Sequence, residues 1–384
     1  MAGLYIHIPF CVRKCIYCDF YSIPSVEGSV AQRLRSYVYA DQHVFLDALE
    51  KELESLPEDF APETIFIGGG TPTELSDRDF ASFLDLLRQK VTFDQLREWT
   101  CESNPGTLTE EKVRLLREAG VNRMSIGVQS FDPAALEFLG RIHSADEARA
   151  GIRLLKAAGF QSMNLDLIYG IPTVDPDVLS ADLAAAVELG VDHIAAYCLI
   201  FEDGTPLADL QRKGYVKEVD DDVELAQYQL VRSRLADAGY HQYELSNFAK
   251  PGHECLHNLL YWDGGEYFGC GPSAHSHWQG RRWSNVRSLE SYCKQWLTGT
   301  FAPAMEEMLS PEAKARELVI FGLRKTRGIQ FADFTARTGY TLDQLYGDTL
   351  GWLCDIGMLT RDAGSIRLTE SGLFLSDSVF AELV

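Results

Sequence analysis

Short apolar runs alternate with helical repeats along the chain as far as residue 199. Apolar runs of strand length begin at about Leu4 and recur at 64–67, 99–102, 123–128, 162–168 and 193–199. Apolar residues at helical spacing lie between them, at 37–56, 77–90, 109–119, 144–158 and 177–189. Strands and helices in strict turn indicate parallel strands with right-handed crossovers, which a doubly wound sheet and a partial (β/α) barrel both satisfy. This part of the chain therefore predicts an α/β fold with six parallel strands.

The pattern changes twice after residue 199. A helix at 221–238 and a short strand at 242–245 come first, and 251–285 is then rich in glycine, aromatic and histidine residues, as expected of short edge strands with packed aromatic side chains. From residue 310 onward, three helices, a hairpin across 362–365 and a last helix resemble a winged-helix module. We expect three parts: a barrel at 1–240, a small α+β extension at 241–302 and the winged-helix-like module at 303–384.

Charge and hydrophobicity narrow the class of protein. The 384 residues are 46% hydrophobic, enough for an ample core, and the net charge of −21 argues against binding to a nucleic-acid backbone. The C-terminal module carries eight basic against twelve acidic residues, which favours a lid or a partner-docking role over DNA reading. No basic and apolar leader precedes the first strand and no apolar run reaches about 20 residues. We therefore expect a cytoplasmic protein without a transmembrane segment.

Three of the nine cysteines are clustered at Cys-x3-Cys-x2-Cys spacing, directly after the first apolar strand: Cys11, Cys15 and Cys18. The other six are scattered, which suits a reducing compartment. Three thiolates this close can hold a [4Fe–4S] cluster and leave one iron open to an outside ligand. A zinc site would need a fourth cysteine or histidine nearby, and buried structural cysteines would not recur in a loop that also carries Arg13 and Lys14. The spacing therefore predicts an iron–sulfur site.

Polar and glycine residues follow several of the predicted strands. The strand at 64–67 runs into three glycines and Thr71, where the backbone can turn with positive φ, approach a ligand closely and donate from free N–H groups, although a tight turn without a ligand is the alternative. Glu102, Gln129 and Asp166 come at the ends of later strands, and each alone is more often a helix cap or a solvated loop residue. Both candidate architectures bind ligands at the carboxyl ends of their strands. Together these positions predict one binding site.

The three cysteines, with Tyr17 just before the last, resemble the radical S-adenosylmethionine (SAM) superfamily. That resemblance implies an open six-stranded barrel and a SAM molecule whose methionine end binds the open iron. It also implies cofactor-binding roles for a set of strand-end and loop residues. These are Tyr5 and Tyr17 near the cluster, Gly69, Gly70 and Thr71 at the methionine end, and Glu102, Gln129, Arg141 and Asp166 as further SAM contacts.

Along its whole length the chain is similar to the family of oxygen-independent coproporphyrinogen III oxidase and its relatives. In the oxidase a fourth cysteine follows two residues after the third, whereas this chain has Phe20, and nothing resembling the oxidase's N-terminal arm precedes the first strand. The segment Cys255-x-His257-Asn258-x-x-Tyr261-Trp262 is instead similar to the motif of the heme chaperones of this family. The resemblance therefore implies a radical SAM protein that binds and cleaves SAM, binds heme and hands it to acceptor hemoproteins, membrane-bound respiratory subunits among them.

Two alternatives stay open at this point: oxidative decarboxylation of coproporphyrinogen III in anaerobic heme biosynthesis, and radical SAM chemistry on an unrelated substrate. A thiolate from Cys255 and an imidazole from His257 are both suitable axial ligands for heme iron, and the neighbouring aromatic pair is suited to cover a porphyrin face. The residues leave open which of the two binds iron. They identify no catalytic side chain.

Overall fold

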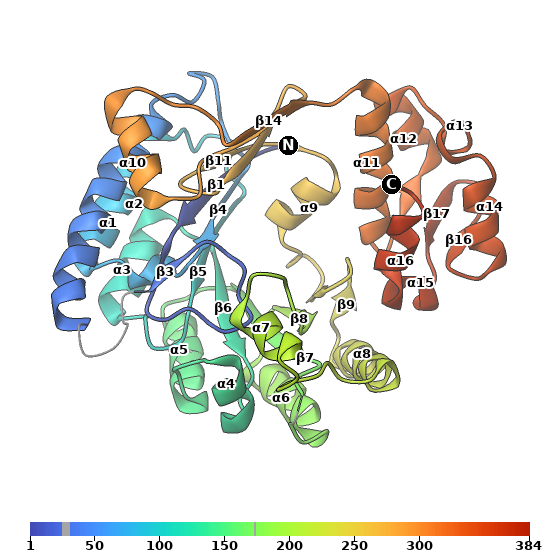
Figure 1. Ribbon diagram of the computed structural model, residues 1–384, viewed down its shortest axis with the longest axis horizontal. Helices are drawn as coiled ribbons and strands as arrows, with labels where there is room; N and C mark the ends of the chain where they lie inside the picture. Colours follow the sequence, from blue (N-terminus) through green and yellow to red (C-terminus); the bar gives the residue numbers. More distant parts are fainter. Residues whose placement is uncertain (25–30, 173) are drawn as a thin grey trace.

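The structure is a computed structural model that describes residues 1–24, 31–172 and 174–384, with side chains described outside 31–41. Six parallel strands lie side by side in chain order: β1 (Ala2–Ile8), β4 (Thr64–Gly69), β5 (Glu98–Ser103), β6 (Arg123–Gln129), β7 (Ser162–Tyr169) and β8 (His193–Cys198). They curve into a partial barrel (Figure 1). The six predicted strands and the α/β fold class are confirmed.

Helices cover the outer face of this sheet, as Figure 1 shows. They are α1 (Ala31–Leu53), α2 (Asp77–Lys90), α3 (Glu110–Ala119), α4 (Pro133–Leu139), α5 (Ala145–Ala157) and α6 (Asp177–Leu189), with a 3₁₀ turn η2 (Pro72–Glu74) before α2. Side-chain caps set where several of them begin. Ser144, for example, forms a capping box with Glu147 at the start of α5. The sequence analysis missed α4, which is only seven residues long.

The strands separate an apolar outer layer from a polar inner one. Leu4, Ile6 and Ile8 of β1 are fully buried against the helices, whereas Tyr5 and His7 alternate with them and point to the inside of the barrel. The apolar core continues under α2 around Phe80, Phe83 and Trp99. The inner face is therefore free to carry polar chemistry.

Beyond the barrel the chain extends the same sheet at both edges. At one edge, after α7 (Pro206–Arg212) and α8 (Asp221–Asp237), β10 (Asn247–Ala249) and β9 (His241–Gln242) follow β8. At the other, β11 (Glu266–Cys270) pairs parallel to β1, and β12 (His275–Trp278), β13 (Arg281–Ser284) and β14 (Met305–Met308) follow antiparallel. The expectation of strands throughout 251–285 is wrong in one place, because α9 (Leu256–Trp262) is a helix.

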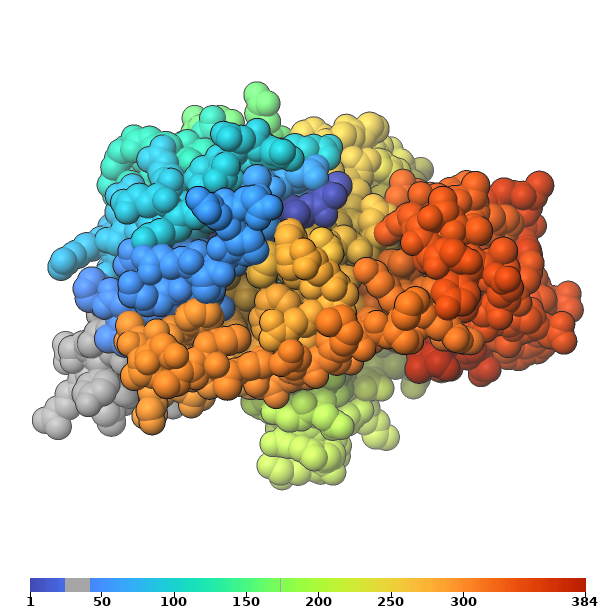
Figure 2. Space-filling view, turned by 90° about the horizontal axis from the view of Figure 1, so that it is seen from above, coloured from blue at the N-terminus to red at the C-terminus, as the bar shows by residue number. Residues whose placement is uncertain are grey.

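The C-terminal residues form a separate lobe with its own apolar core, seen in red in Figures 1 and 2. Its elements follow the order expected of a winged helix: α11 (Pro311–Arg324), β15 (Ile329–Gln330), α12 (Phe331–Thr338), α13 (Leu342–Tyr346), α14 (Asp348–Asp355), the hairpin β16 (Leu359–Arg361) and β17 (Ser365–Leu368), then α15 (Glu370–Phe374) and α16 (Ser376–Ala381). Ion pairs of Lys325 and Arg327 with Asp263 join the lobe to the end of α9. The domain limits at 240 and 302 stay a prediction.

Glu52 links α1 to the β11–β14 extension from a buried position. Its carboxylate accepts hydrogen bonds from Gly271 N (2.7 Å), Tyr292 OH (2.5 Å) and Asn285 Nδ2 (2.6 Å); Tyr292 lies in α10 (Leu289–Thr298). Burial outweighs these bonds and raises the pKa of Glu52 from its ordinary 4.5 to about 7. The folded protein therefore keeps a proton that the unfolded chain has already released.

This raised pKa predicts a pH dependence of stability. The free energy of unfolding should fall as the pH rises from about 4.5 to about 7, with a contribution from Glu52 of about 3 kcal/mol at most. Glu52→Gln removes that titration, so the variant should lose less stability than the wild type between pH 5 and pH 7. Urea unfolding of both proteins at the two pH values measures the difference. Equal losses in both would contradict the prediction.

Candidate functional site

The three clustered cysteines lie in one loop at the carboxyl end of β1. Cys11 ends the short strand β2 (Phe10–Cys11), and Cys15 and Cys18 follow in irregular backbone before β3 (Ile23–Pro24). Burial, together with the neighbouring Cys15 and Cys11, raises the pKa of Cys18 to about 11. Thiolates packed this closely need compensating positive charge, and iron ions would supply it.

The cysteines do not form a site for a single metal ion. Among the residues that the structure describes, no three histidine, cysteine or carboxylate side chains converge closely enough to share one ion. A cubane cluster makes no such demand, because each cysteine binds a different iron atom. The donor set, three thiols in one loop, therefore fits a [4Fe–4S] cluster.

A chain of hydrogen bonds connects two of the cysteines through the strand ends. Arg141 donates from Nη1 to Cys15 Sγ (3.5 Å) and from Nη2 to Asn104 Oδ1 (2.6 Å). Asn104 donates from Nδ2 to Thr71 Oγ1 (2.6 Å), and Thr71 Oγ1 lies 3.4 Å from Cys11 Sγ. The Nε of Arg141 is buried and has no partner among the described residues, so the guanidinium keeps a free donor beside the cysteine loop. Two predicted residues, Thr71 and Arg141, thus meet at the cysteines, joined by Asn104.

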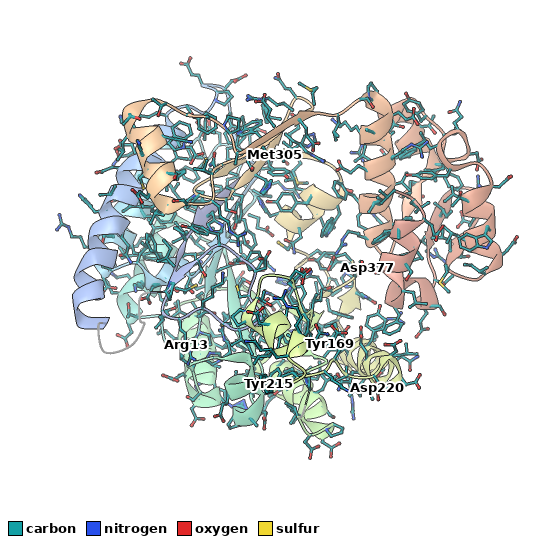
Figure 3. All side chains as sticks on the ribbon, in the orientation of Figure 1. Arg13, Tyr169, Tyr215, Asp220, Met305 and Asp377 are labelled. Carbon is teal, nitrogen blue, oxygen red and sulfur yellow. The ribbon has the colours of Figure 1, made fainter. Side chains whose placement is uncertain are left out.

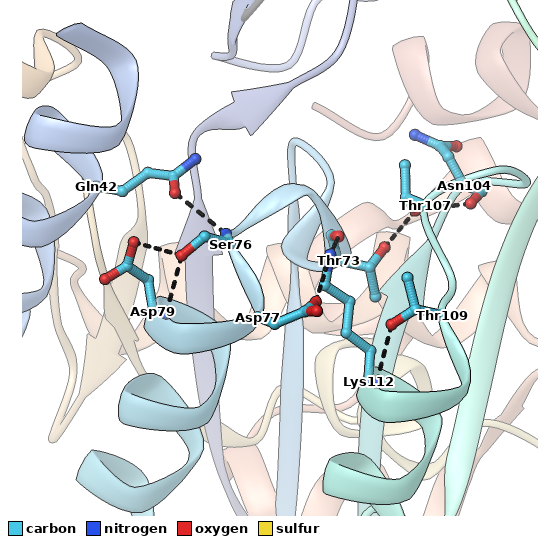
Figure 4. A network of polar contacts seen from close by, with 9 residues as sticks. All are labelled: Gln42, Thr73, Ser76, Asp77, Asp79, Asn104, Thr107, Thr109 and Lys112. Carbon is cyan, nitrogen blue, oxygen red and sulfur yellow. Dashed lines mark hydrogen bonds and ion pairs between the residues drawn. The ribbon is translucent and has the colours of Figure 1, made fainter. Parts of the chain in front are cut away.

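A second polar network connects the loop that carries Asn104 to the turn after β4 (Figure 4). Thr107 donates to the carbonyl of Asn104 (2.7 Å) and bonds Thr73 (2.6 Å), which lies in the turn after β4. Lys112 donates from Nζ to the carbonyl of Thr73 (2.6 Å). The loop with Asn104 and the turn with Thr71 are therefore fixed to each other before any ligand binds.

The glycine turn packs against the cysteine loop, and the amides of Gly69 and Gly70 are both bonded. Gly69 N donates to Glu102 Oε2 (3.2 Å), and Gly70 N donates to the carbonyl of Ile8 (2.8 Å), so the expectation of free N–H groups is wrong. A Cβ on Gly69, where φ is +100°, would lie 2.5 Å from the His7 ring, and one on Gly70 would lie 2.5 Å from the Phe10 carbonyl. The backbone carbonyls are left as the groups that can face a ligand.

Two carboxylates face the same region, Glu102 from the end of β5 and Asp166 from the middle of β7. Burial raises the pKa of Glu102 to about 8, with a further contribution from Asp166, and burial raises the pKa of Asp166 to about 6. Asp166 accepts a hydrogen bond from Asn164 Nδ2 (2.6 Å). Gln129 ends β6 at a bulge with φ +70°, close to Asn104 and Arg141. The acceptors thus lie close together in partly to fully buried positions, and the charges of Arg123 and Arg141 only partly offset the effect of burial on the two carboxylates.

The two predicted tyrosines flank the cysteine loop. His7 Nε2 donates to the carbonyl of Tyr21 (2.8 Å), so Nδ1 is the acceptor of the Tyr5 hydroxyl (3.1 Å). Burial lowers the pKa of His7 to about 4, which keeps this ring neutral. Burial raises the pKa of Tyr17, and Cys15 raises it further. Tyr5 therefore lies under the glycine turn and Tyr17 lies beside Cys15.

Cys255 and His257 lie at the opposite end of the strands. Glu98, the first residue of β5, accepts hydrogen bonds from Cys255 Sγ (3.4 Å), Leu256 N (2.9 Å) and His257 N (3.0 Å). His257 also bonds Thr64 Oγ1 through Nδ1 (2.8 Å) and Tyr261 OH through Nε2 (2.9 Å). Cys255 is 0% exposed and His257 1%. The structure does not bring these two residues to the cysteine loop, and a ligand would reach them only if α9 moved.

Comparisons with known proteins agree with this architecture. Residues 5–184 match the profile of the radical SAM superfamily, and residues 309–375 match that of the HemN C-terminal domain. Proteins named heme chaperone HemW are 35% identical in Bacillus subtilis, over 99% of this chain and 98% of theirs, and 39% identical in Haemophilus influenzae, over 98% and 96%. The chain belongs to the HemW family. Membership of the radical SAM superfamily implies a [4Fe–4S] cluster and SAM.

A solved structure shows the fold that the HemW family shares with its relatives. Coproporphyrinogen III oxidase (HemN) from Escherichia coli superposes with a TM-score of 0.84 over 100% of this chain and 89% of its own, at 24% identity. The partial barrel and the C-terminal lobe are therefore an architecture common to both. Within the described residues, no helix is long and apolar enough to cross a membrane.

Two residues of this site escaped the sequence analysis. Asn104 follows Glu102 at the end of β5, and its place after a strand was the one available signal. Glu98 contacts α9 across more than 150 residues of chain, and no local pattern predicts such a contact.

Proposed function

We propose that the chain is a heme carrier that holds a [4Fe–4S] cluster through Cys11, Cys15 and Cys18, binds SAM beside it, and transfers heme to acceptor hemoproteins. The observation that carries this proposal is the near full-length match to proteins named heme chaperone HemW. The convergence of the strand-end residues on the cysteine loop supports the cofactor part of it.

The residues around the cysteines have distinct tasks in this proposal. Arg141 and the Thr71 hydroxyl donate to Cys15 and Cys11, which stabilises their thiolate forms. A [4Fe–4S] cluster held by the three cysteines would supply, when reduced, the electron for SAM cleavage. The carbonyls of Gly69 and Gly70 accept from the methionine ammonium, because their amides are already used.

The carboxylates are assigned to the polar groups of SAM. Asp166 and Glu102 accept from the ribose hydroxyls and the ammonium group, and a cation at this place favours their ionised forms over the protonated forms that burial favours. Gln129 adds a neutral amide at the same edge, and Tyr5 and Tyr17 close the sides of the cysteine loop. Bulky aromatic walls exclude water from a reactive radical.

For heme binding, the proposal relies on the sequence motif at α9. Cys255 and His257 are the iron ligands that the resemblance implies. In this structure both are satisfied by Glu98, Thr64 and Tyr261, so iron binding at either residue requires α9 to open.

A titration with ferric heme tests the function. We expect the anaerobically purified chain to bind one heme, and incubation with coproporphyrinogen III, SAM and a reductant to give no protoporphyrinogen. Transfer of the bound heme to an apo-hemoprotein, followed by its Soret absorbance, tests the carrier role. Multiple turnovers to protoporphyrinogen would overturn the proposal in favour of the oxidase.

The likeness of fold to HemN makes oxidase activity the second candidate. Phe20, at the position of the fourth cysteine, is 67% exposed, and its carbonyl accepts from Lys14 Nζ (3.1 Å). A cysteine at this position would therefore add an exposed thiol and rebuild no buried site. We expect Phe20→Cys to remain without oxidase activity, measured in the same product assay.

A further inference from the structure

A cavity of about 380 Å³ lies on the inner face of the sheet extension, between α9 and α11. Aromatic side chains make up much of its wall: Tyr261 and Trp262 of α9, Tyr267 of β11 and Phe321 of α11. Met305 of β14, labelled in Figure 3, also lines the cavity and is 38% exposed. This volume is at the low end of the range for small-molecule sites, roughly 300–1,000 Å³, so a porphyrin held here would keep one edge in solvent. Partial exposure is what transfer to another protein requires.

The polar groups of the cavity stand in one row across the sheet. Tyr267, His277, Arg282 and Glu307 are direct register partners on β11, β12, β13 and β14, so their side chains share a face. Arg282 also pairs with Glu317 of α11, which closes the row on the side of the C-terminal lobe. His277 is therefore flanked by an aromatic ring and a cation.

One atom of this row has no partner. His277 is 4% exposed, and its Nδ1 lies 3.2 Å from the carbonyl of Gly265. Because a carbonyl can only accept, Nδ1 carries the proton and Nε2 of the neutral ring is an unprotonated base. Nε2 is buried and has no hydrogen-bond partner among the described residues. Leaving such an acceptor unpaired is unfavourable unless a ligand completes it.

This arrangement is that of a metal-binding histidine. In such residues one ring nitrogen donates to a backbone carbonyl, which fixes the tautomer, and the other binds the metal. Burial lowers the pKa of His277, which keeps the ring neutral and available. A second buried atom without a partner, Nε1 of Trp262, lies in a residue of the same wall and offers a donor to a carboxylate of the ligand.

We propose that this cavity is the heme site and that His277 Nε2 binds the heme iron, a proposal that rests on the heme-carrying function above. The ring faces of Tyr261 and Trp262 pack against the porphyrin. The side chains that cover Nε2 in the free protein move aside when heme binds.

The proposal also gives the sequence motif a physical role. Tyr261 OH is bonded to His257 Nε2 (2.9 Å), and Cys255 and His257 are tied to Glu98 at the start of α9. Cys255 and His257, the buried part of the motif, fix the start of the helix. Tyr261 and Trp262, its aromatic part, line the cavity. His257 is then a positioning residue that holds the wall of the site.

Titration of the full chain with ferric heme tests the ligand. The variant His277→Ala should bind heme at least tenfold more weakly with a shifted Soret band, and added imidazole should restore the wild-type spectrum by filling the vacated position. His277→Gln, which keeps a polar side chain of similar length, should show the same shift with the fold retained by circular dichroism. His43→Ala is the matched control, because His43 is exposed on α1 and lies outside the cavity.

The outcomes separate this inference from the function on which it rests. If wild type binds no heme, the proposed function fails. If wild type binds heme and both His277 variants keep its affinity and Soret band, the function stands and the assignment of His277 is overturned. A Soret change confined to Cys255→Ala or His257→Ala would likewise overturn it in favour of those residues.

Discussion

A Cys15→Ala protein is expected to hold no cluster, whereas the reconstituted wild type should hold about four iron atoms per chain. Cys15 is the middle cysteine of the loop, and its thiol accepts from Arg141 at one end of the hydrogen-bond chain to Cys11. Its loss removes one of three protein ligands and leaves the guanidinium of Arg141 without that acceptor. Iron and sulfide analysis, together with iron–sulfur absorbance, measures the effect.

Cys354→Ala is the control for this experiment. Cys354 is a free cysteine in α14 of the C-terminal lobe, outside the barrel, and its loss should leave the iron content unchanged. Cluster absorbance that survives in Cys15→Ala would place the cluster at other cysteines.

Glu98→Ala is expected to cost about 3–5 kcal/mol of the free energy of unfolding. The buried carboxylate accepts hydrogen bonds from Cys255 Sγ, Leu256 N and His257 N. Arg123 lies close enough for an electrostatic attraction between its guanidinium and Glu98. Removal of the carboxylate leaves three donors without their acceptor and the buried Arg123 without this nearby negative charge. The midpoint of urea unfolding measures the loss.

Two further variants define what Glu98 contributes. Glu118→Ala removes an exposed carboxylate that pairs with Arg114 on the surface of α3, and should change stability by less than about 1 kcal/mol. Glu98→Gln keeps one acceptor oxygen and should fall between the wild type and Glu98→Ala. Equal stability of Glu98→Ala and wild type would mean that the start of α9 does not depend on this carboxylate.

The sequence predicted the six parallel strands and their helices well because their signal is local, whereas only the resemblance to radical SAM proteins favoured a barrel over a doubly wound sheet. Each strand is a short apolar run between polar turns, and a helix of regular period follows, so the topology comes from order alone. The cysteine loop was equally accessible, because all three thiols fall within eight residues. In both cases the residues that matter are neighbours in the chain.

The same reasoning failed where distant residues decide the structure. Leu256–Trp262 is a short apolar run that suits a strand or a helix, and periodicity does not separate the two at this length. Its helical form is tied to the carboxylate of Glu98, which accepts from the amides of the first turn. His277 likewise gave no local signal, since its unpaired nitrogen is visible only once Gly265 and the opposing strands are in place.

The position of β1 has a consequence for synthesis of the chain. β1 pairs with β4 on one side, which is made soon afterwards, but its other partner is β11, so that Ala2 pairs with Glu266 and Ile6 with Cys270. On the ribosome one edge of the strand that leads into the cysteine loop therefore stays open until almost three quarters of the protein has been made. An unpaired strand edge next to apolar side chains is prone to aggregate. A nascent or truncated chain that ends near residue 240 should thus depend on chaperones in a way that the finished protein does not.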